Sequence, residues 1–284
     1  MRTLVINSSN YVAGSGNQFT YNFPTTVKFN DGDSVGVASI AVYNSTFNIT
    51  AARGNNKISL IWNAATPTTT TFTIPDGYYS TSDLNYFLQQ QCITNKLYCT
   101  NSSGQYVYFV EFQVNAPRYA IQFNSYAIPT AASATTLGYT IPSGATWSFP
   151  ASAQTPQITF NQAFGNLVGL KAGTLPSAIQ STNYSIVSTT TPIISPIDSY
   201  ILTCSLCDSP YSIPSDTFFT LPLSGGLGSL ISASPSQIVF NSIKPNFYKS
   251  FTIRFFDQLF NVLPLQDRSV TITLAIQEAS QKIK

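Results

Sequence analysis

The segment "SVTITLAIQ" (Ser269–Gln277) alternates large apolar residues with polar or small ones more cleanly than any other part of the chain. Successive side chains of a strand point to opposite faces, so the large apolar residues of this segment share one face of an extended backbone. These residues are Val270, Ile272, Leu274 and Ile276. The segment is therefore predicted to be a β-strand that buries one face and exposes the other.

The same alternation recurs along the chain and predicts about eight strands, as in "SFTIRFFD", where Phe251, Ile253 and Phe255 share a face. The breaks "FNDGDS", "AATPT" and "NAP" are predicted to join neighbouring strands as antiparallel hairpins. Several other connections are long, which favours a β-sandwich over a barrel built of hairpins alone. The strand candidates before the last one are Gln18–Phe23, Ser34–Ile49, Lys57–Asn63, Thr69–Ile74, Ser102–Val114, Arg118–Ile128, Asp198–Cys207, Ser236–Ile243 and Phe247–Asp257.

One helix is predicted among these strands, within "TFTIPDGYYSTSDLNYFLQQQ" (Thr71–Gln91), directly after the fourth strand candidate. Ser80 is a suitable N-cap, and Asp83 three residues later forms a weaker version of the capping box. An apolar stripe follows at helical spacing, made of Leu84, Phe87, Leu88 and Cys92. We expect this helix to lie across one end or flank of the sandwich and to contribute shape rather than chemistry.

Between about residues 129 and 196 the pattern loosens into short apolar pieces separated by Ala, Ser, Thr, Gly and Pro. Phe160–Leu170, "FNQAFGNLVGL", is predicted to form one or two helical turns within it. The region holds too little periodic apolar content for a core of its own. We therefore expect a single domain over residues 1–284, with an irregular inserted excursion at about 129–196 that packs on the main body.

Composition excludes several classes of function. The 284 residues contain no histidine, only 8% are charged and the net charge is +2. Without histidine the chain lacks the commonest general base and the commonest metal ligand. The basic residues form no stripe that would neutralise phosphates, so we expect no specific nucleic acid partner. No apolar run approaches 18 residues and the N-terminus lacks a signal-peptide core, which predicts a protein made in the cytosol with no membrane span.

The four cysteines are the strongest candidates for a metal site. "CSLC" has the spacing of a zinc knuckle, and "CITNKLYC" could add a second, looser pair. Alternation in "YILTCSLCD", however, would send the last two cysteines to opposite faces of a strand, so buried reduced thiols are favoured over zinc. The cysteines are Cys92, Cys99, Cys204 and Cys207.

The acidic residues give no clear catalytic pair. Six of them stand in predicted turns, where a carboxylate ordinarily accepts hydrogen bonds from nearby backbone amides. A glycosidase using two carboxylates is the remaining enzymatic alternative, and no pair of acids stands out for it. We therefore predict no enzyme, with no catalytic, cofactor-binding or metal-binding residues and no cofactor. The six acids are Asp31, Asp33, Asp76, Asp208, Asp216 and Asp267.

Aromatic residues leave a second class of function open. Tyr or Trp along a strand packs in a core more often than it binds a ligand, but an exposed ring such as Trp62 or Trp147 could stack on a sugar. A carbohydrate-binding or receptor-attachment β-sandwich is thus the alternative to a structural role.

Four motifs in order resemble a known family: "TFTIPDGYYSTSDLNYFLQQQ", "FGNLVGL", "TPIISPIDSYILTCSLCD" and "FTIRFFDQLFNVLPLQDRSVTITLAIQ". Together with their spacing, which covers about Phe19 to Gln277, they are similar to the penton (minor capsid) proteins of virophages and Polinton-like viruses. The resemblance implies a single jelly-roll β-sandwich of eight antiparallel strands in two sheets. Its first strands would be Gln18–Phe29 and Ser34–Thr46, and its last two Phe247–Asp257 and Ser269–Glu278.

The resemblance also implies a structural virion protein. Homopentamers would close the five-fold vertices of an icosahedral capsid, surrounded by trimers of a double-jelly-roll major capsid protein, after assembly in the host cell cytoplasm. A five-fold ring needs two different complementary flanks on each subunit, and polar uncharged flanks can meet with little charge desolvation. Two smaller hypotheses concern the loops. Asp257 and Arg268 could brace a final hairpin loop by pairing, although separate solvated loop charges are favoured, and the N-terminal segment before Gln18 would be either an arm or a frayed end.

Overall fold

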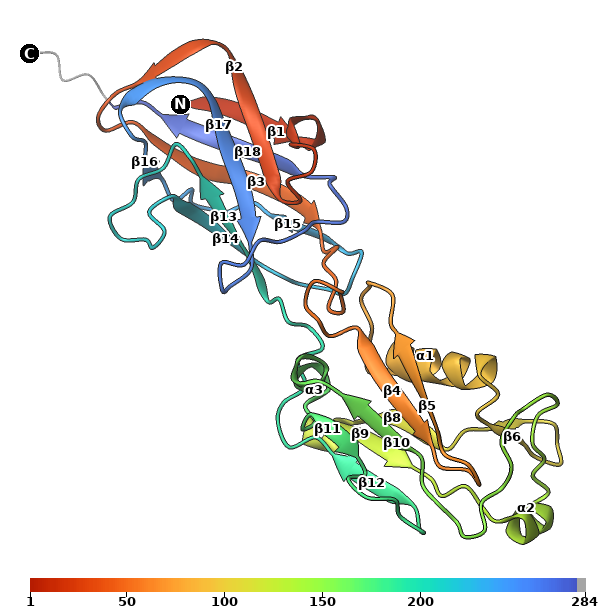
Figure 1. The fold of residues 1–284 in the computed structure, drawn as a ribbon. Helices are drawn as coiled ribbons and strands as arrows, with labels where there is room; N and C mark the ends of the chain where they lie inside the picture. Colours follow the sequence, from red (N-terminus) through yellow and green to blue (C-terminus); the bar gives the residue numbers. More distant parts are fainter. Residues whose placement is uncertain (280–284) are drawn as a thin grey trace, which may run out of the picture. The chain divides into compact units, whose positions relative to one another are not determined.

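The computed structural model of the chain describes residues 1–279; the last five residues, which the expected domain included, lie outside this range. The described chain is mostly β and its sheets are antiparallel (Figure 1), which confirms the predicted all-β class. Contacts group it into two compact units. Unit 1 comprises residues 1–46 and 197–279, and unit 2 is Phe47–Pro196. Each unit has its own hydrophobic core.

Unit 1 contains two sheets. The first has the order β1-β18-β3-β15, with β16 also pairing with β3, and the second has the order β14-β13-β17-β2. A short 3-10 helix, η1 (Ser8–Asn10), follows β1. The strands of the first sheet are β1 (Arg2–Asn7), β3 (Ser34–Tyr43), β15 (Leu230–Ala233), β16 (Asn241–Ser242) and β18 (Thr271–Gln277). Those of the second are β2 (Gln18–Phe29), β13 (Ser199–Cys204), β14 (Thr217–Pro222) and β17 (Asn246–Phe256).

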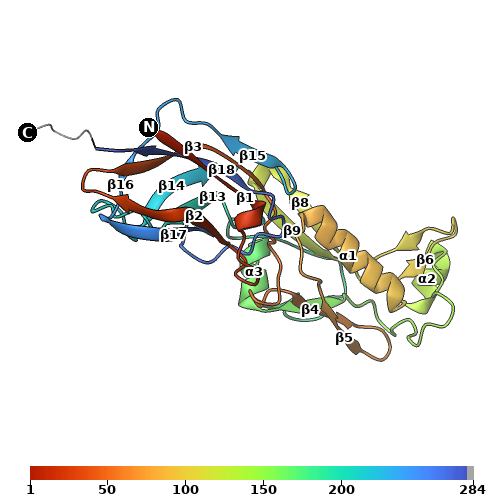
Figure 2. The same cartoon turned by 90° about the horizontal axis from the view of Figure 1, so that it is seen from above.

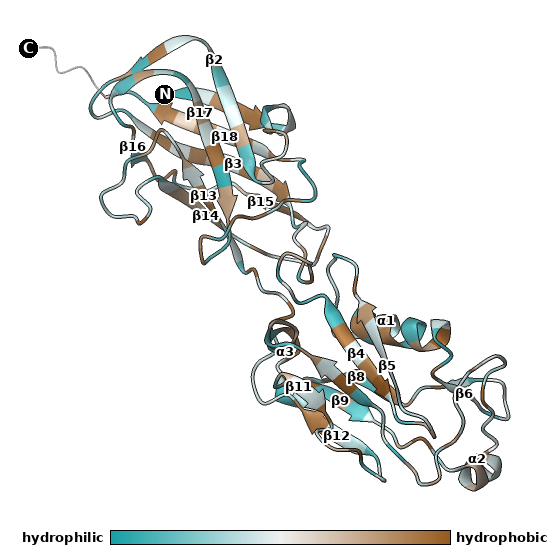
Figure 3. Cartoon of the chain, in the orientation of Figure 1, coloured by the Kyte–Doolittle hydropathy of each residue, from teal (hydrophilic) through white to brown (hydrophobic). Residues whose placement is uncertain are grey.

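The core of unit 1 lies between these two sheets and is supplied by the faces that the sequence predicted to be buried. Ile272 and Leu274 of β18 are fully buried from one sheet, and Ile253 and Phe255 of β17 from the other. The ring of Phe19 on β2 meets that of Phe255 edge to face, with centroids 5.7 Å apart. Figure 3 shows apolar residues along the strands of both units, as on β4 and β18.

Two expected hairpins of unit 1 are wrong. β2 pairs with β17 and β3 pairs with β18, so the "FNDGDS" turn joins strands of different sheets. The loop between β17 and β18 likewise crosses from one sheet to the other. Two strands with one apolar face each can bury those faces either side by side in a hairpin or opposite each other in facing sheets. The turn between them does not decide which arrangement forms. In unit 1 the strands β1, β14 and β15 were not expected. The candidate Ser236–Ile243 is reduced to the two residues of β16.

Unit 2 contains a four-stranded sheet of order β11-β10-β4-β5, a three-stranded sheet of order β12-β9-β8 and a small β6-β7 pair. The predicted β4–β5 and β8–β9 hairpins are both present. The strands are β4 (Lys57–Trp62), β5 (Thr68–Thr73), β6 (Cys99–Thr100), β7 (Tyr106–Val107), β8 (Val110–Asn115), β9 (Ala120–Ser125), β10 (Gln157–Phe160), β11 (Gly173–Leu175) and β12 (Tyr184–Val187). The helices are α1 (Thr81–Thr94), α2 (Ala131–Leu137), α3 (Gln162–Val168) and the 3-10 turn η2 (Ala116–Arg118).

The predicted helix α1 is present, and its cap is the predicted one. The hydroxyl of Ser80 accepts a hydrogen bond from the backbone N–H of Asp83 at 3.2 Å, and the Asp83 carboxylate accepts one from the Ser80 N–H at 2.9 Å. The apolar stripe of the helix enters the core of unit 2, with Leu84 and Leu88 buried. Figure 2 shows α1 alongside β8, the strand with which it makes its main contacts.

The boundary of the inserted region lies earlier than the expected residue 129. Residues 129–196 belong with residues 47–128 to unit 2, because they complete sheets that the earlier residues begin: β10 pairs with β4, and β12 pairs with β9. Phe160–Leu170 includes the predicted helical turns as α3. These short segments therefore need no core of their own, since they share one with strands almost 100 residues earlier.

A buried asparagine holds the two ends of unit 2 together. The Asn48 side-chain amide donates to the backbone carbonyls of Tyr79 and Ile194, both at 2.8 Å, and its oxygen accepts from the Tyr79 N–H at 2.8 Å. Asn48 is 1% exposed and lies near the start of the unit, while Ile194 lies near its end. The unit therefore closes on itself at the place where the chain enters and leaves it.

Candidate functional site

The cysteines are divided between the two cores, with Cys204 and Cys207 in unit 1 and Cys92 and Cys99 in unit 2. All four are free and buried, and residues 1–279 contain no cluster of three or more His, Cys, Asp or Glu side chains placed to hold a metal. Burial raises the pKa of Cys92 to about 12, and a hydrogen bond that the Cys207 thiol makes to Cys204, with burial second, raises the pKa of Cys207. The expectation that Cys204 and Cys207 occupy opposite faces is wrong: β13 ends at Cys204, and a turn returns Cys207 to the same core.

Three of the six turn carboxylates accept hydrogen bonds from backbone N–H groups, as the sequence predicts, while that of Asp208 lies 3.8 Å from the Lys244 ammonium. Asp33 is almost fully buried and accepts hydrogen bonds from the N–H groups of Asn30 and Ala279, each at 2.8 Å. The side chain of Asp76 accepts from the Ala51 N–H at 2.8 Å, and that of Asp267 from the Ser269 N–H at 2.8 Å. These carboxylates hold loops in place.

Asp257 and Arg268 have separate partners, so the pairing hypothesis is wrong. Asp257 is 5% exposed and its carboxylate accepts hydrogen bonds from the N–H groups of Leu259 and Asn261 at 2.8 Å. The guanidinium of Arg268 lies 4.4 Å from the centre of the Tyr11 ring. A carboxylate that already caps its own loop has little need of a counter-ion, and Arg268 gains a cation–π contact instead.

The two tryptophans are core residues. Trp62 is fully buried and Trp147 is 7% exposed; their rings meet edge to face at 5.2 Å, and the Trp147 indole N–H donates to the Lys96 carbonyl at 2.7 Å. Both rings therefore pack in the core, which was the favoured expectation for them, and neither is exposed as the alternative of stacking on a sugar requires.

Unit 1 presents apolar side chains in a loop and on its outer strands. Tyr211 and Ile213, in the loop between β13 and β14, are 97% and 94% exposed. Val5 on β1 and Leu230 on β15 are each about half exposed, and these two strands are the outermost of the first sheet. Isolated exposed apolar residues are ordinary, but a nearly bare Tyr and Ile two residues apart mark a surface suited to contact with another protein.

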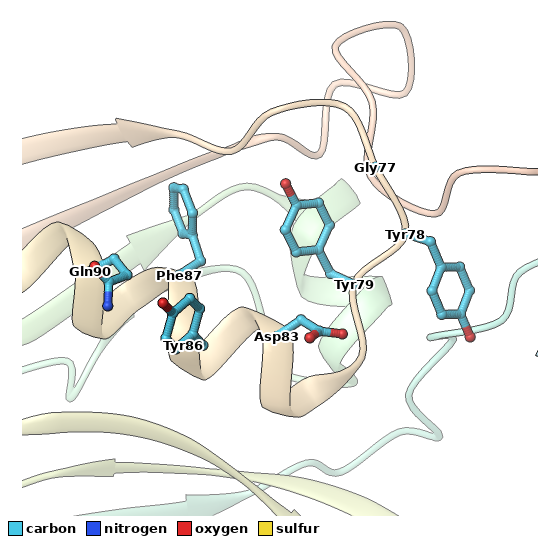
Figure 4. A pocket seen from close by; sticks show the side chains of 7 residues that line it. All are labelled: Gly77, Tyr78, Tyr79, Asp83, Tyr86, Phe87 and Gln90. Carbon is cyan, nitrogen blue, oxygen red and sulfur yellow. The ribbon is translucent and has the colours of Figure 1, made fainter. Parts of the chain in front are cut away.

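Unit 2 has a hollow of about 430 Å³ beside α1. In Figure 4, Gln90 and Asp83 lie toward the two ends of the visible helix, with Tyr86 and Phe87 between them and Tyr79 opposite. Asp83, Tyr86 and Gln90 share one face because they are three and four residues apart. The Tyr79 hydroxyl donates to the Pro75 carbonyl at 3.0 Å. Sequence reasoning missed this site, although the helical spacing of these three polar side chains was a readable signal.

Unit 2 also contains a cluster of tyrosines. The rings of Tyr98 and Tyr106 lie 4.6 Å apart, and each lies 6.5 Å from the ring of Tyr108. Burial first, and then the thiol of Cys92 and the surrounding phenols, raise the pKa of Tyr108. These three rings line no part of the hollow.

A comparison with solved structures finds matches to two virophage proteins. The crystal structure of the mavirus penton protein matches over 98% of this chain and 100% of its own, with a TM-score of 0.44 and 10% identity. A chain of the Sputnik virophage structure matches over 98% of both chains, with a TM-score of 0.40 and 10% identity. No protein-family model and no curated protein sequence matches the chain.

None of the helices in residues 1–279 combines the length and the apolar character required to cross a bilayer.

Proposed function

We propose that the chain is a structural capsid protein, a penton, in which unit 1 is a jelly roll and unit 2 an insertion. The observation that carries the proposal is the strand order of unit 1. Its eight main strands, taken along the chain, are β1, β2, β3, β13, β14, β15, β17 and β18. Numbered 1 to 8 in that sequence, they give sheets of order 1-8-3-6 and 5-4-7-2, the order of a jelly roll.

The strand order also accounts for the crossing connections. Every step along these eight strands passes to the other sheet except β13 to β14, which form a hairpin. Unit 2 enters between the third and fourth strands, so the eight-strand arrangement is complete without it. The expectation of a single domain over residues 1–284 stays a prediction, now with the insertion beginning at Phe47.

Jelly rolls occur in viral capsids and in lectins, so the fold alone leaves both classes open. The four ordered sequence motifs favour the capsid class, and a surface with few charges suits permanent contact with other protein. We therefore propose a homopentamer at the five-fold vertices of an icosahedral capsid, bounded by trimers of a double-jelly-roll major capsid protein. Its place would be the virion, assembled in the host cell cytoplasm, and it would need no cofactor and catalyse no reaction.

The exposed side chains of unit 1 provide the flanks that such a ring needs. A five-fold contact is heterologous, so two different surfaces of one subunit must meet. The outer strands β1 and β15 offer backbone edges with Val5 and Leu230, and the loop that carries Tyr211 and Ile213 offers an apolar projection. Burying such a projection in a neighbour removes two nearly bare apolar side chains from water.

Light scattering after size exclusion tests the proposal on the full chain, alone and mixed with the major capsid protein. We expect a pentamer, or particles that form only in the mixture. A double variant, Tyr211→Ser with Ile213→Ser, should weaken assembly and leave the melting temperature unchanged. The matched control Val239→Ser, at a residue 73% exposed in the same unit, should assemble normally. A chain that stays monomeric and never associates with the major capsid protein would refute the proposal.

A further inference from the structure

We propose that unit 2 binds a neutral sugar in the hollow beside α1, between Tyr79 and the side of the helix that carries Asp83, Tyr86 and Gln90. The inference does not rest on the capsid role, since its residues all belong to unit 2. The following three observations carry it: the shape of the site, its unused hydrogen-bonding groups and its charge.

The hollow has the composition of a small-ligand site. Its volume of about 430 Å³ falls within the usual range for ligand pockets, and apolar rings and a few polar groups line it together. Tyr86 is 64% exposed and Phe87 is half-buried, so their rings are accessible to a ligand. The C–H groups of a pyranose form an apolar face that packs on such rings, as apolar groups do on aromatic faces in general.

Three polar groups in the hollow keep hydrogen-bonding capacity that the described protein does not use. The Ser80 bonds to the Asp83 carboxylate go to its Oδ2 atom, and no protein donor in residues 1–279 reaches Oδ1. The Tyr86 hydroxyl and the Gln90 amide are likewise without a partner among the described residues. Together they offer two acceptors of different kinds, an amide donor and a hydroxyl, which match the vicinal hydroxyls of a sugar.

The charge of the hollow favours a neutral sugar. Asp83 stays ionised because a hydrogen bond from the Ser80 side chain, with one from its backbone second, lowers the pKa of its carboxyl. The lining includes no Lys or Arg that would pair with a sialic acid or sulfate group. A cationic ligand would use the carboxylate and the rings, but it would leave the Gln90 amide donors and the Tyr86 hydroxyl without a role.

Titration calorimetry and saturation-transfer NMR on the full chain test the proposal, with cello-, xylo-, manno- and chito-oligosaccharides as neutral probes. Sialyllactose and a heparin hexasaccharide serve as acidic probes and tetramethylammonium as a cationic one. We expect saturable binding of at least one neutral probe and weaker or no binding of the acidic ones. Absence of saturable binding by every neutral probe, or preference for an acidic probe or the cation, would overturn the proposal.

Variants locate the site. Tyr86→Ala should weaken binding of the neutral probe by about tenfold, because one stacked ring is lost. The melting temperature of the protein should not change, because the Tyr86 side chain is 64% exposed. The control Tyr119→Ala removes a tyrosine that is 78% exposed, directly after the 3-10 turn η2 and outside the lining of the hollow, and should leave affinity unchanged. Asp83→Asn retains an acceptor for Ser80 but replaces the free carboxylate oxygen with an amide donor, so it should weaken binding of the neutral probe by about threefold or more. Equal effects of the Tyr86 and Tyr119 variants would place the ligand elsewhere and refute the assignment.

Discussion

The replacement Leu88→Ala tests whether the two units have independent cores. Leu88 lies on α1, is fully buried and belongs to the core of unit 2. Removing its three outer carbons forfeits roughly 2.4 kcal/mol at about 0.8 kcal/mol for each carbon. Incomplete collapse around the cavity raises the loss to about 3.5 kcal/mol. For a unit of this size, that corresponds to a fall of about 10 °C in the melting temperature of unit 2.

Differential scanning calorimetry provides the measurement. We expect two transitions, of which Leu88→Ala lowers only one. The matched variant is Leu202→Ala on β13, a residue equally buried in the core of unit 1, and it should lower only the other transition. If both variants move one common transition by similar amounts, the chain unfolds as a single cooperative body and the reasoning from separate cores is refuted.

Four further predictions concern buried polar groups and the helix cap. Asn48→Ala should destabilise unit 2 by about 3 kcal/mol in urea titrations, because it leaves two buried carbonyls and an N–H without partners. Ser80→Ala should lower the free energy of unfolding by about 1 kcal/mol in the same assay. Because the folded-state pKa of Asp83 is lowered, the stability of the wild type should be full near neutrality and fall as acid protonates that carboxylate. This pH dependence should be weaker in the variant. Asp257→Ala should lower stability by about 2 kcal/mol through loss of its loop hydrogen bonds, whereas an unchanged value would mean that the loop is held by packing alone. With its pKa raised to about 12, Cys92 should react with a maleimide at pH 8 only after unfolding, and rapid labelling of the native chain would contradict its burial.

Features encoded by neighbouring residues could be predicted from the sequence. Helix α1 is one, because its cap at Ser80 and Asp83 and its apolar stripe all lie within one short segment. The buried faces of β17 and β18 are another, since alternation decides which side chains point inward. These inferences depend on contacts between residues that are close in sequence, where the physical rules are local.

Features that depend on distant partners could not be predicted. Alternation shows that β2 has an apolar face but not that its partner is β17, more than 200 residues later. The start of the insertion at Phe47 is hidden for the same reason, because β4 becomes part of unit 2 only by pairing with β5 and β10. The burial of Trp147 was hidden as well, because it lies outside the strands and its ring packs against that of Trp62, far away in the sequence.

The hydrogen bonds of Asn48 have a consequence for how unit 1 can fold although unit 2 interrupts its chain. Closing a flexible loop of 150 residues costs more entropy than closing one of about ten, by roughly 2.4 kcal/mol. Because Asn48 bonds to Ile194, the fold of unit 2 itself brings its two ends together. When unit 1 folds, it therefore loses only the entropy of closing a short loop. Unit 2 is in this sense a cassette: exchange for a brief linker should leave the eight-strand scaffold able to fold, and a foreign domain with adjacent termini could take its place.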